Sequence, residues 1–257
     1  MGDGGKRESA DVGRGALLSV SGLRVRYGSF EAVRGVSFSL AEGEILGIVG
    51  ESGSGKSTVA RALVGLAAPS AGTVERAPDA AMQMIFQDAT GSLNPRMTVR
   101  QTLAEALACG RGGAGTRPAD TPEGLLSLVG LSEAVLGQYP REMSGGQCQR
   151  ISVARALACG PKVLIADEPV SALDGSVQAR VLNLLRDLRR GLGLSILLIA
   201  HDLAVVKNVC DRICVMERGV FVDEGPAEEV FAAPRSDYTR RLLAAVPDVA
   251  RELSAAR

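Results

Sequence analysis

The sequence contains no tryptophan, and aromatic residues occupy only 3% of its 257 positions. Neither sign of charge is in excess, because 29 lysines and arginines balance 29 aspartates and glutamates. Proteins that bind a nucleic-acid backbone or an anionic bilayer usually carry an excess of basic groups, and those that stack on bases need aromatic side chains. The composition therefore disfavours a nucleic-acid partner.

Long apolar runs are missing as well. No stretch approaches the ~20 apolar residues that a membrane-spanning helix needs, and residues 1–20 lack the apolar core of a signal peptide. We therefore expect the chain to stay in the cytosol. The cysteines form no close pair of the metal-ligand type, and their odd number without an export signal predicts buried free thiols at Cys109, Cys148, Cys159, Cys210 and Cys214.

The strand and helix patterns that are present are typical of an α/β protein with a helical insertion. Residues 1–15 are polar and rich in glycine, which predicts a flexible tail, and residues 16–257 are expected to form one domain. Helical runs dominate about residues 89–160. We expect this segment to be a helical subdomain inserted in the α/β core, with a mobile glycine-rich loop in its middle.

The second half of the core is expected to contain an amphipathic helix that ends at Gly191. Apolar residues recur at helical spacing along one face of this segment: Val177, Val181, Leu184, Leu185 and Leu188. The wholly apolar run SILLIA follows, and it is typical of a buried parallel strand.

A phosphate-binding loop is predicted at residues 50–58, GESGSGKST, which match G-x-x-x-x-G-K-[ST] between a predicted strand and a predicted helix. Glycines allow successive N–H groups to point at phosphate oxygens, and the helix N-terminus adds partial positive charge. We expect Lys56 to reach the β- and γ-phosphates and Ser57 to bind Mg²⁺. The nucleotide-binding set is Gly50, Ser52, Gly53, Ser54, Gly55, Lys56, Ser57 and Thr58.

Two carboxylates end the predicted buried strand VLIADEP, residues 163–169. Beside a phosphate loop, Asp167 is expected to bind Mg²⁺, through water, and Glu168 to polarise the attacking water. An Asp-Glu pair after a strand can also cap a helix.

Three more residues stand at the ends of predicted strands. His201, the only histidine, follows a strand that we expect to neighbour the one carrying Glu168, where its ring could touch a γ-phosphate; a hydrogen-bonded core histidine is the alternative. Gln87 ends an earlier strand, and Tyr27 could stack on adenine. For both Gln87 and Tyr27, the alternative is an ordinary solvent-exposed residue at the end of a strand.

A second glycine loop, MSGGQCQR at residues 143–150, opens a predicted helix but has no lysine. Taken by itself, it also reads as an ordinary helix cap. Together with the phosphate loop, Gln87, VLIADEP, SALD at residues 171–174 and His201, in this order, it makes the sequence resemble the ATP-binding-cassette ATPase family from about residue 17 onward. The resemblance implies an α/β fold: a P-loop NTPase core with a predominantly parallel sheet, an N-terminal antiparallel β region and a helical insert subdomain.

The resemblance also implies how the two glycine loops work together. In this family two ATPase subunits pair head to tail, and the second loop of one subunit caps the γ-phosphate held by the other. Asp174 would lie at the junction, and Gln87 would bind Mg²⁺ or water and move the insert. The catalytic residues implied are Glu168, His201, Gln87 and Lys56, and the additional nucleotide contacts are Tyr27, Ser144, Gly145, Gly146, Gln147 and Asp174.

Three further stretches are similar to the ATPase subunits of oligopeptide, dipeptide and nickel importers: SLNPRMTV (92–99), VSALDGSVQARVLNLL (170–185) and SDYTRRLLAAVP (236–247). Such importers join two ATPases, identical or paralogous, to two membrane permeases and an external solute-binding protein. The resemblance therefore implies a peripheral subunit at the cytoplasmic face of the membrane that uses ATP to drive uptake of peptides.

One alternative is an importer with the same mechanism whose solute is nickel, glutathione or an opine-like molecule. The other is a soluble cassette ATPase without a transport role. The sequence also departs from the usual pattern of this group. Cys148 replaces the basic residue that commonly follows the signature glutamine, DATGSLNP lacks the usual proline in its approach, and Ser236 and Asp237 replace a common His-Pro pair.

Overall fold

The computed structural model describes residues 16–109, 118–171 and 173–245. Residues 1–15 and 110–117 lie outside the described residues, so the expected flexible tail and mobile loop remain predictions. A six-stranded sheet forms the centre of the molecule, with strand order β5-β6-β7-β3-β8-β9. The strands span Met82–Ile85 (β5), Val163–Asp167 (β6), Ser195–Ala200 (β7), Ile45–Val49 (β3), Arg212–Glu217 (β8) and Val220–Pro226 (β9).

The large sheet is parallel except for β9, which pairs antiparallel with β8. Every residue of β3, β6 and β7 is buried, because apolar layers cover both faces of the sheet. Alternate residues point to opposite faces. Ile45 and Ile196 belong to one buried cluster, whereas Leu46 and Leu197 belong to the other. The predicted mainly parallel α/β core is confirmed.

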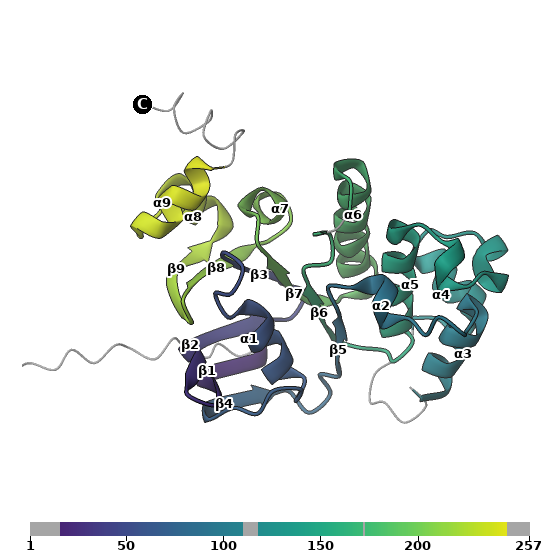
Figure 1. The fold of residues 1–257 in the computed structure, drawn as a ribbon, viewed down its shortest axis with the longest axis horizontal. Coiled ribbons are helices and arrows are strands. Elements are labelled where there is room, and N and C mark those ends of the chain that lie inside the picture. Colours follow the sequence, from purple (N-terminus) through teal and green to yellow (C-terminus); the bar gives the residue numbers. More distant parts are fainter. Residues whose placement is uncertain (1–15, 110–117, 172, 246–257) are drawn as a thin grey trace, which may run out of the picture.

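A smaller antiparallel sheet covers one face of the core. Its strand order is β2-β1-β4, with β1 spanning Ala16–Tyr27, β2 Phe30–Ala41 and β4 Ala71–Arg76. Helix α1, Lys56–Leu63, lies between this sheet and the large one and shares their apolar cluster. Figure 1 shows this sheet at the bottom of the molecule, and it is the antiparallel β region that the resemblance implies.

Helices form a separate group beside β5 and β6, at the right of Figure 1. The group comprises α2 (Ala89–Ser92), α3 (Val99–Cys109), α4 (Pro122–Leu128), the 3-10 helices η2 (Glu133–Gly137) and η3 (Pro140–Glu142), and α5 (Gly145–Leu157). Helix α5 contacts α2, α3 and α4 on one side, and β5 and α6 on the other. It therefore connects the helical group to the core.

Helix α6, Gly175–Leu192, packs on the face of the sheet opposite to α1. Val181, Leu185 and Leu188 are buried, whereas Val177 and Leu184 are half-buried. The expected end at Gly191 is wrong, because Gly193 adopts a left-handed conformation (φ 67°) and terminates the helix. The remaining helices are α7 (Leu203–Lys207), α8 (Ala227–Ala232) and α9 (Asp237–Ala244).

None of the five cysteines, all of which lie in the described part of the chain, forms a disulfide. Cys148, Cys210 and Cys214 are buried, as expected, whereas Cys159 is half-buried. The expectation of burial is wrong for Cys109, which is exposed at the last position of α3. Within the described part of the chain, no helix combines the length and apolar character needed to cross a membrane.

Candidate nucleotide-binding site

The predicted phosphate loop connects the end of β3 to the first turn of α1. Gly50 has no room for a side chain, because a Cβ atom there would lie 2.1 Å from the carbonyl oxygen of Met216. Gly53 and Gly55 adopt φ values of 80° and 110°, which side-chain-bearing residues rarely reach. The glycines of the pattern are therefore required by the backbone path and by close packing.

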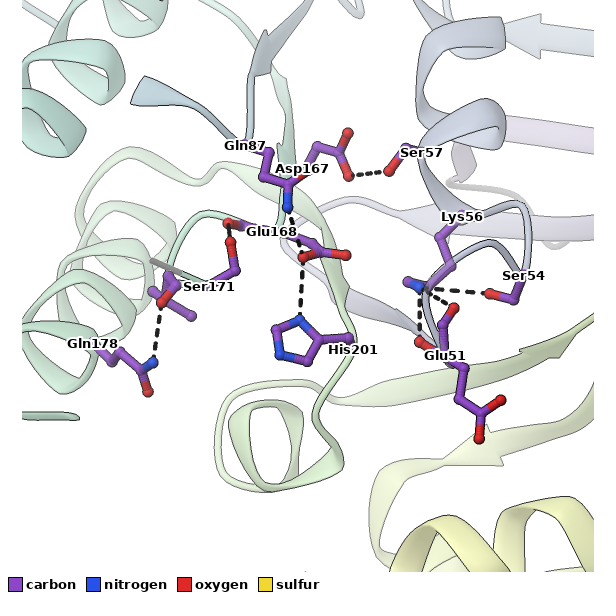
Figure 2. A network of polar contacts seen from close by, with 12 residues as sticks. Glu51, Ser54, Lys56, Ser57, Gln87, Asp167, Glu168, Ser171, Gln178 and His201 are labelled. Carbon is purple, nitrogen blue, oxygen red and sulfur yellow. Dashed lines mark hydrogen bonds and ion pairs between the residues drawn. The ribbon is translucent and has the colours of Figure 1, made fainter. Parts of the chain in front are cut away.

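Lys56 folds back onto this loop (Figure 2). Its Nζ atom donates hydrogen bonds to the carbonyl oxygens of Gly50, at 2.7 Å, and Glu51, at 2.8 Å. Burial lowers the pKa of Lys56, while the negative charges of Glu168 and Asp167 oppose that shift. An ammonium group held among carbonyl oxygens can exchange these bonds for phosphate oxygens.

Ser57 and Asp167 bring two oxygen atoms together at the start of α1. The Ser57 hydroxyl donates to Asp167 Oδ1 at 2.8 Å, and Asp167 is only 2% exposed. Burial raises the pKa of Asp167, and the hydrogen bond from Ser57 counteracts this.

The oxygen donor set of Ser57 and Asp167 suits Mg²⁺. Over the described ranges, no group of three or more histidine, cysteine or acidic side chains could hold a metal by itself. Mg²⁺ usually takes one or two protein oxygen ligands and completes its shell with substrate phosphates and water. The residues present therefore fit a magnesium ion that arrives with a nucleotide.

Glu168 lies between Gln87 and His201. Its Oε2 atom accepts a hydrogen bond from Gln87 Nε2 at 3.1 Å and lies 3.1 Å from His201 Nδ1 (Figure 2). Parallel pairing of β6 with β7 places Asp167 opposite Ile199, which brings His201 next to Glu168. The expected neighbourhood of these two strands is confirmed.

The backbone at Glu168 is strained, with φ at 46°. A non-glycine residue in this region costs about 1–3 kcal/mol and persists only where its surroundings enforce it. Here the Glu168 N–H donates to the Ile199 carbonyl oxygen at 3.0 Å, and the Ser171 hydroxyl donates to the Glu168 carbonyl oxygen at 3.2 Å. Glu168 lines the same cleft as residues of the phosphate loop.

The alternative interpretations of these residues do not fit the structure. Asp174, not the Asp167–Glu168 pair, is the residue that precedes α6. The His201 side chain is 51% exposed, so it is no core histidine. Both observations favour roles for Glu168 and His201 toward a ligand.

A cleft of about 650 Å³ lies at the carboxyl ends of the parallel strands, and Gly50, Ser54 and Asp167 are not among its lining residues. Tyr27 lines the cleft, as expected for a residue that contacts a base. Phe30, which the sequence analysis missed, pairs with Tyr27 across the β1–β2 hairpin and lines the cleft as well. The other lining residues are Ala32, Ser52, Gly53, Gly55, Lys56, Ser57, Thr58, Gln87, Glu168, Ser171 and His201.

The second glycine loop lies elsewhere. Ser144 precedes α5, and its hydroxyl accepts the Gln147 N–H, while Gln147 Oε1 accepts the Ser144 N–H at 2.9 Å. None of the residues Ser144, Gly145, Gly146, Gln147 and Asp174 lines the cleft. The described chain therefore does not bring these five predicted nucleotide contacts to its own phosphate loop.

One contact to the phosphate loop was not foreseen. Tyr238 of α9 is 6% exposed, and its hydroxyl accepts the backbone N–H of Glu51 at 3.0 Å. Tyr238 belongs to the stretch 236–247, which the sequence analysis singled out for its similarity to importer ATPases. The sequence did not indicate that this stretch contacts the phosphate loop. Residues 246 and 247 of that stretch lie outside the described residues.

Comparisons with known proteins agree with this geometry. The family described as ABC transporter matches residues 33–171. The chain is 44% identical to the oligopeptide transport ATP-binding protein OppF of Escherichia coli, over 91% of this chain and 79% of the relative. It is 47% identical to the oligopeptide transport ATP-binding protein OppD of Mycobacterium tuberculosis, over 88% of this chain but only 39% of that longer protein.

Solved structures of similar fold are cassette proteins. CbiO1 from Clostridium perfringens, part of the ABC transporter complex cbiONQ, has a TM-score of 0.75 at 26% identity and covers 94% of this chain and all of its own. The ATP-binding cassette MJ0796, solved as a dimer in a post-hydrolysis state with ADP and Pi, has a TM-score of 0.70 at 26% identity. It covers 82% of this chain and 98% of its own.

Proposed function

This chain belongs to the ABC transporter family of ATPases, and from that premise we propose that it energises an importer for peptides or a related solute. The chain binds and hydrolyses ATP. The observation that carries the transport role is the 44% identity to OppF over 91% of the chain. The cargo assignment depends on the names of OppF and OppD, since the solute is selected by other subunits.

Catalysis at this site is mainly positioning and charge stabilisation. The loop N–H groups and Lys56 bind the phosphates, and Tyr27 stacks on the adenine. Mg²⁺ would be held by Ser57 and Gln87, and by Asp167 through water. When bound, the ion would neutralise negative charge on the departing phosphate. Glu168 orients the attacking water and accepts its proton, and His201 sits beside the carboxylate where it can also contact the γ-phosphate.

A second ATPase subunit completes the site. The Ser144 loop does not line the cleft of its own chain. It offers a hydroxyl, N–H groups and a helix N-terminus, and such groups attract anions. We place this loop, with Asp174, against nucleotide bound by a partner ATPase. Loss of the γ-phosphate then opens the dimer, and the helical group passes the movement to two permeases at the cytoplasmic face of the membrane. An external solute-binding protein delivers the solute.

The ATP site is tested by replacing its lysine. Lys56→Ala should weaken binding of a fluorescent ATP analogue by about 10- to 100-fold, because hydrogen bonds to charged groups contribute about 1.5–3 kcal/mol each. Lys162→Ala is the matched control, since Lys162 does not line the cleft, its side chain is 38% exposed, and it pairs with Asp79 on the surface. Equal affinity of Lys56→Ala and the wild type would contradict the assignment.

The transport role is tested by affinity purification of the full chain from solubilised membranes. Recovery of two permease subunits, and loss of peptide uptake in cells that carry Lys56→Ala, are the expected results. Recovery with ribosomes or DNA, without membrane proteins, would contradict the proposal.

A further inference from the structure

Within residues 16–245, as far as the structure describes them, one hydrogen bond joins the phosphate loop to helix α9. The Glu51 N–H donates to the Tyr238 hydroxyl at 3.0 Å, although the two residues are 187 positions apart. Glu51 directly follows Gly50, the first residue of the phosphate-binding pattern. A change in the position of α9 therefore acts on the peptide at which the loop leaves β3.

Helix α9 is itself anchored to the large sheet. Asp223 of β9 accepts the backbone N–H groups of Arg235, at 2.8 Å, and Ser236, at 3.2 Å. The Ser236 hydroxyl then accepts the Thr239 N–H and caps the helix. These bonds hold the first turn of α9, which carries Tyr238, at a defined place against the sheet.

The Glu51 peptide is held from two sides. The Glu51 carbonyl oxygen accepts hydrogen bonds from Lys56 Nζ at 2.8 Å and from the Ser54 N–H at 3.2 Å. The backbone N–H of Glu51 itself donates to the Tyr238 hydroxyl. When Lys56 turns to a phosphate, its bonds to the Gly50 and Glu51 carbonyl oxygens are exchanged. The Tyr238 hydroxyl lies outside the cleft and can keep its hold on the loop throughout.

We propose that Tyr238 is a positioning residue for nucleotide binding, and that its hydroxyl makes the conformation of the phosphate loop depend on the docking of α9. The inference rests on the proposed function, because it assumes that the loop binds ATP. In this proposal, the segment from Ser236 to Ala245 positions the phosphate loop without lining the cleft itself.

Tyr238→Phe removes the hydroxyl and keeps the buried ring. Loss of one neutral hydrogen bond should raise the KM for ATP by about two- to tenfold, while kcat at saturating ATP stays near the wild-type value. Hydrogen exchange at the Glu51 amide should become faster. Asp237→Asn is the matched control, because the Asp237 side chain is 82% exposed and forms its ion pair with Arg240 of the same helix.

A lower melting temperature of Tyr238→Phe with unchanged KM would overturn the proposal, because the hydroxyl would then be merely structural. If this variant does not fold, Ser236→Ala loosens the start of α9 without altering the ring, and an unchanged KM there would also overturn it. Lys56→Ala separates the two hypotheses. Normal ATP binding by Lys56→Ala rejects the proposed function, whereas weak binding by Lys56→Ala and normal kinetics of Tyr238→Phe reject only the role of Tyr238.

Discussion

Two adjacent glycines of the second loop should respond in opposite ways to the same substitution. Gly145 and Gly146 are the first two residues of α5. A Cβ atom at Gly145 would lie 3.4 Å from Leu173 Cδ2, an ordinary contact with a flexible side chain. A Cβ atom at Gly146 would lie 2.5 Å from Val177 Cγ1. The structure therefore predicts that Gly146→Ala, but not Gly145→Ala, destabilises the protein.

The magnitude follows from the overlap. Val177 must retreat by about 0.9 Å to restore a 3.4 Å contact, and a β-branched side chain has few rotamers available for this. Overpacking of this kind costs about 1–3 kcal/mol, and replacing glycine by alanine within a helix returns up to about 1 kcal/mol. From the middle of the overpacking range, about 2 kcal/mol, and a return of up to about 1 kcal/mol, we expect Gly146→Ala to lower the free energy of unfolding by about 1–2 kcal/mol. Gly145→Ala should leave it unchanged or raise it.

Thermal and urea unfolding of the nucleotide-free chain measure the effect. A loss of 1–2 kcal/mol corresponds to a decrease in Tm of about 2–8 °C in a protein of this size. Val177→Ala removes the obstructing methyl groups, so in the double variant it should recover much of the loss caused by Gly146→Ala, as a double-mutant cycle can show. Wild-type stability of Gly146→Ala, or additive effects in the cycle, would refute the reasoning.

Two further predictions concern the carboxylate at the cleft and the buried thiols. Glu168→Gln keeps the shape of the side chain beside Gln87 and His201, so ATP should still bind and hold the proposed dimer closed. Phosphate release should slow by about 10²- to 10⁴-fold, because the general base is lost. Turnover at the normal rate would reject Glu168 as the base. Burial raises the pKa of Cys214 to about 12 and also raises that of Cys210, so both remain protonated thiols near neutral pH. Iodoacetamide should therefore modify the exposed Cys109 of the folded protein and spare Cys210 and Cys214, and mass spectrometry that found either of these two modified would contradict their burial.

The sequence by itself determined the features that a few consecutive residues encode. The glycine and lysine spacing of residues 50–58 predicts the phosphate loop, because backbone freedom and helix start are local properties. The apolar runs before Glu168 and His201 predict buried parallel strands, since only a sheet covered on both faces suits such runs. These patterns were sufficient to indicate the fold class and the nucleotide site.

Only the tertiary structure decided how distant residues meet. It joins the Gln87 side chain to Glu168, distinguishes Gly146 from Gly145 by its contact with Val177, and connects Tyr238 to the phosphate loop. Each of these contacts depends on strand order, helix packing and the direction of a side chain, which no short stretch of sequence contains. The end of α6 at Gly193 also belongs here, because Gly191 and Gly193 are equally able to stop a helix and the tertiary context selects between them.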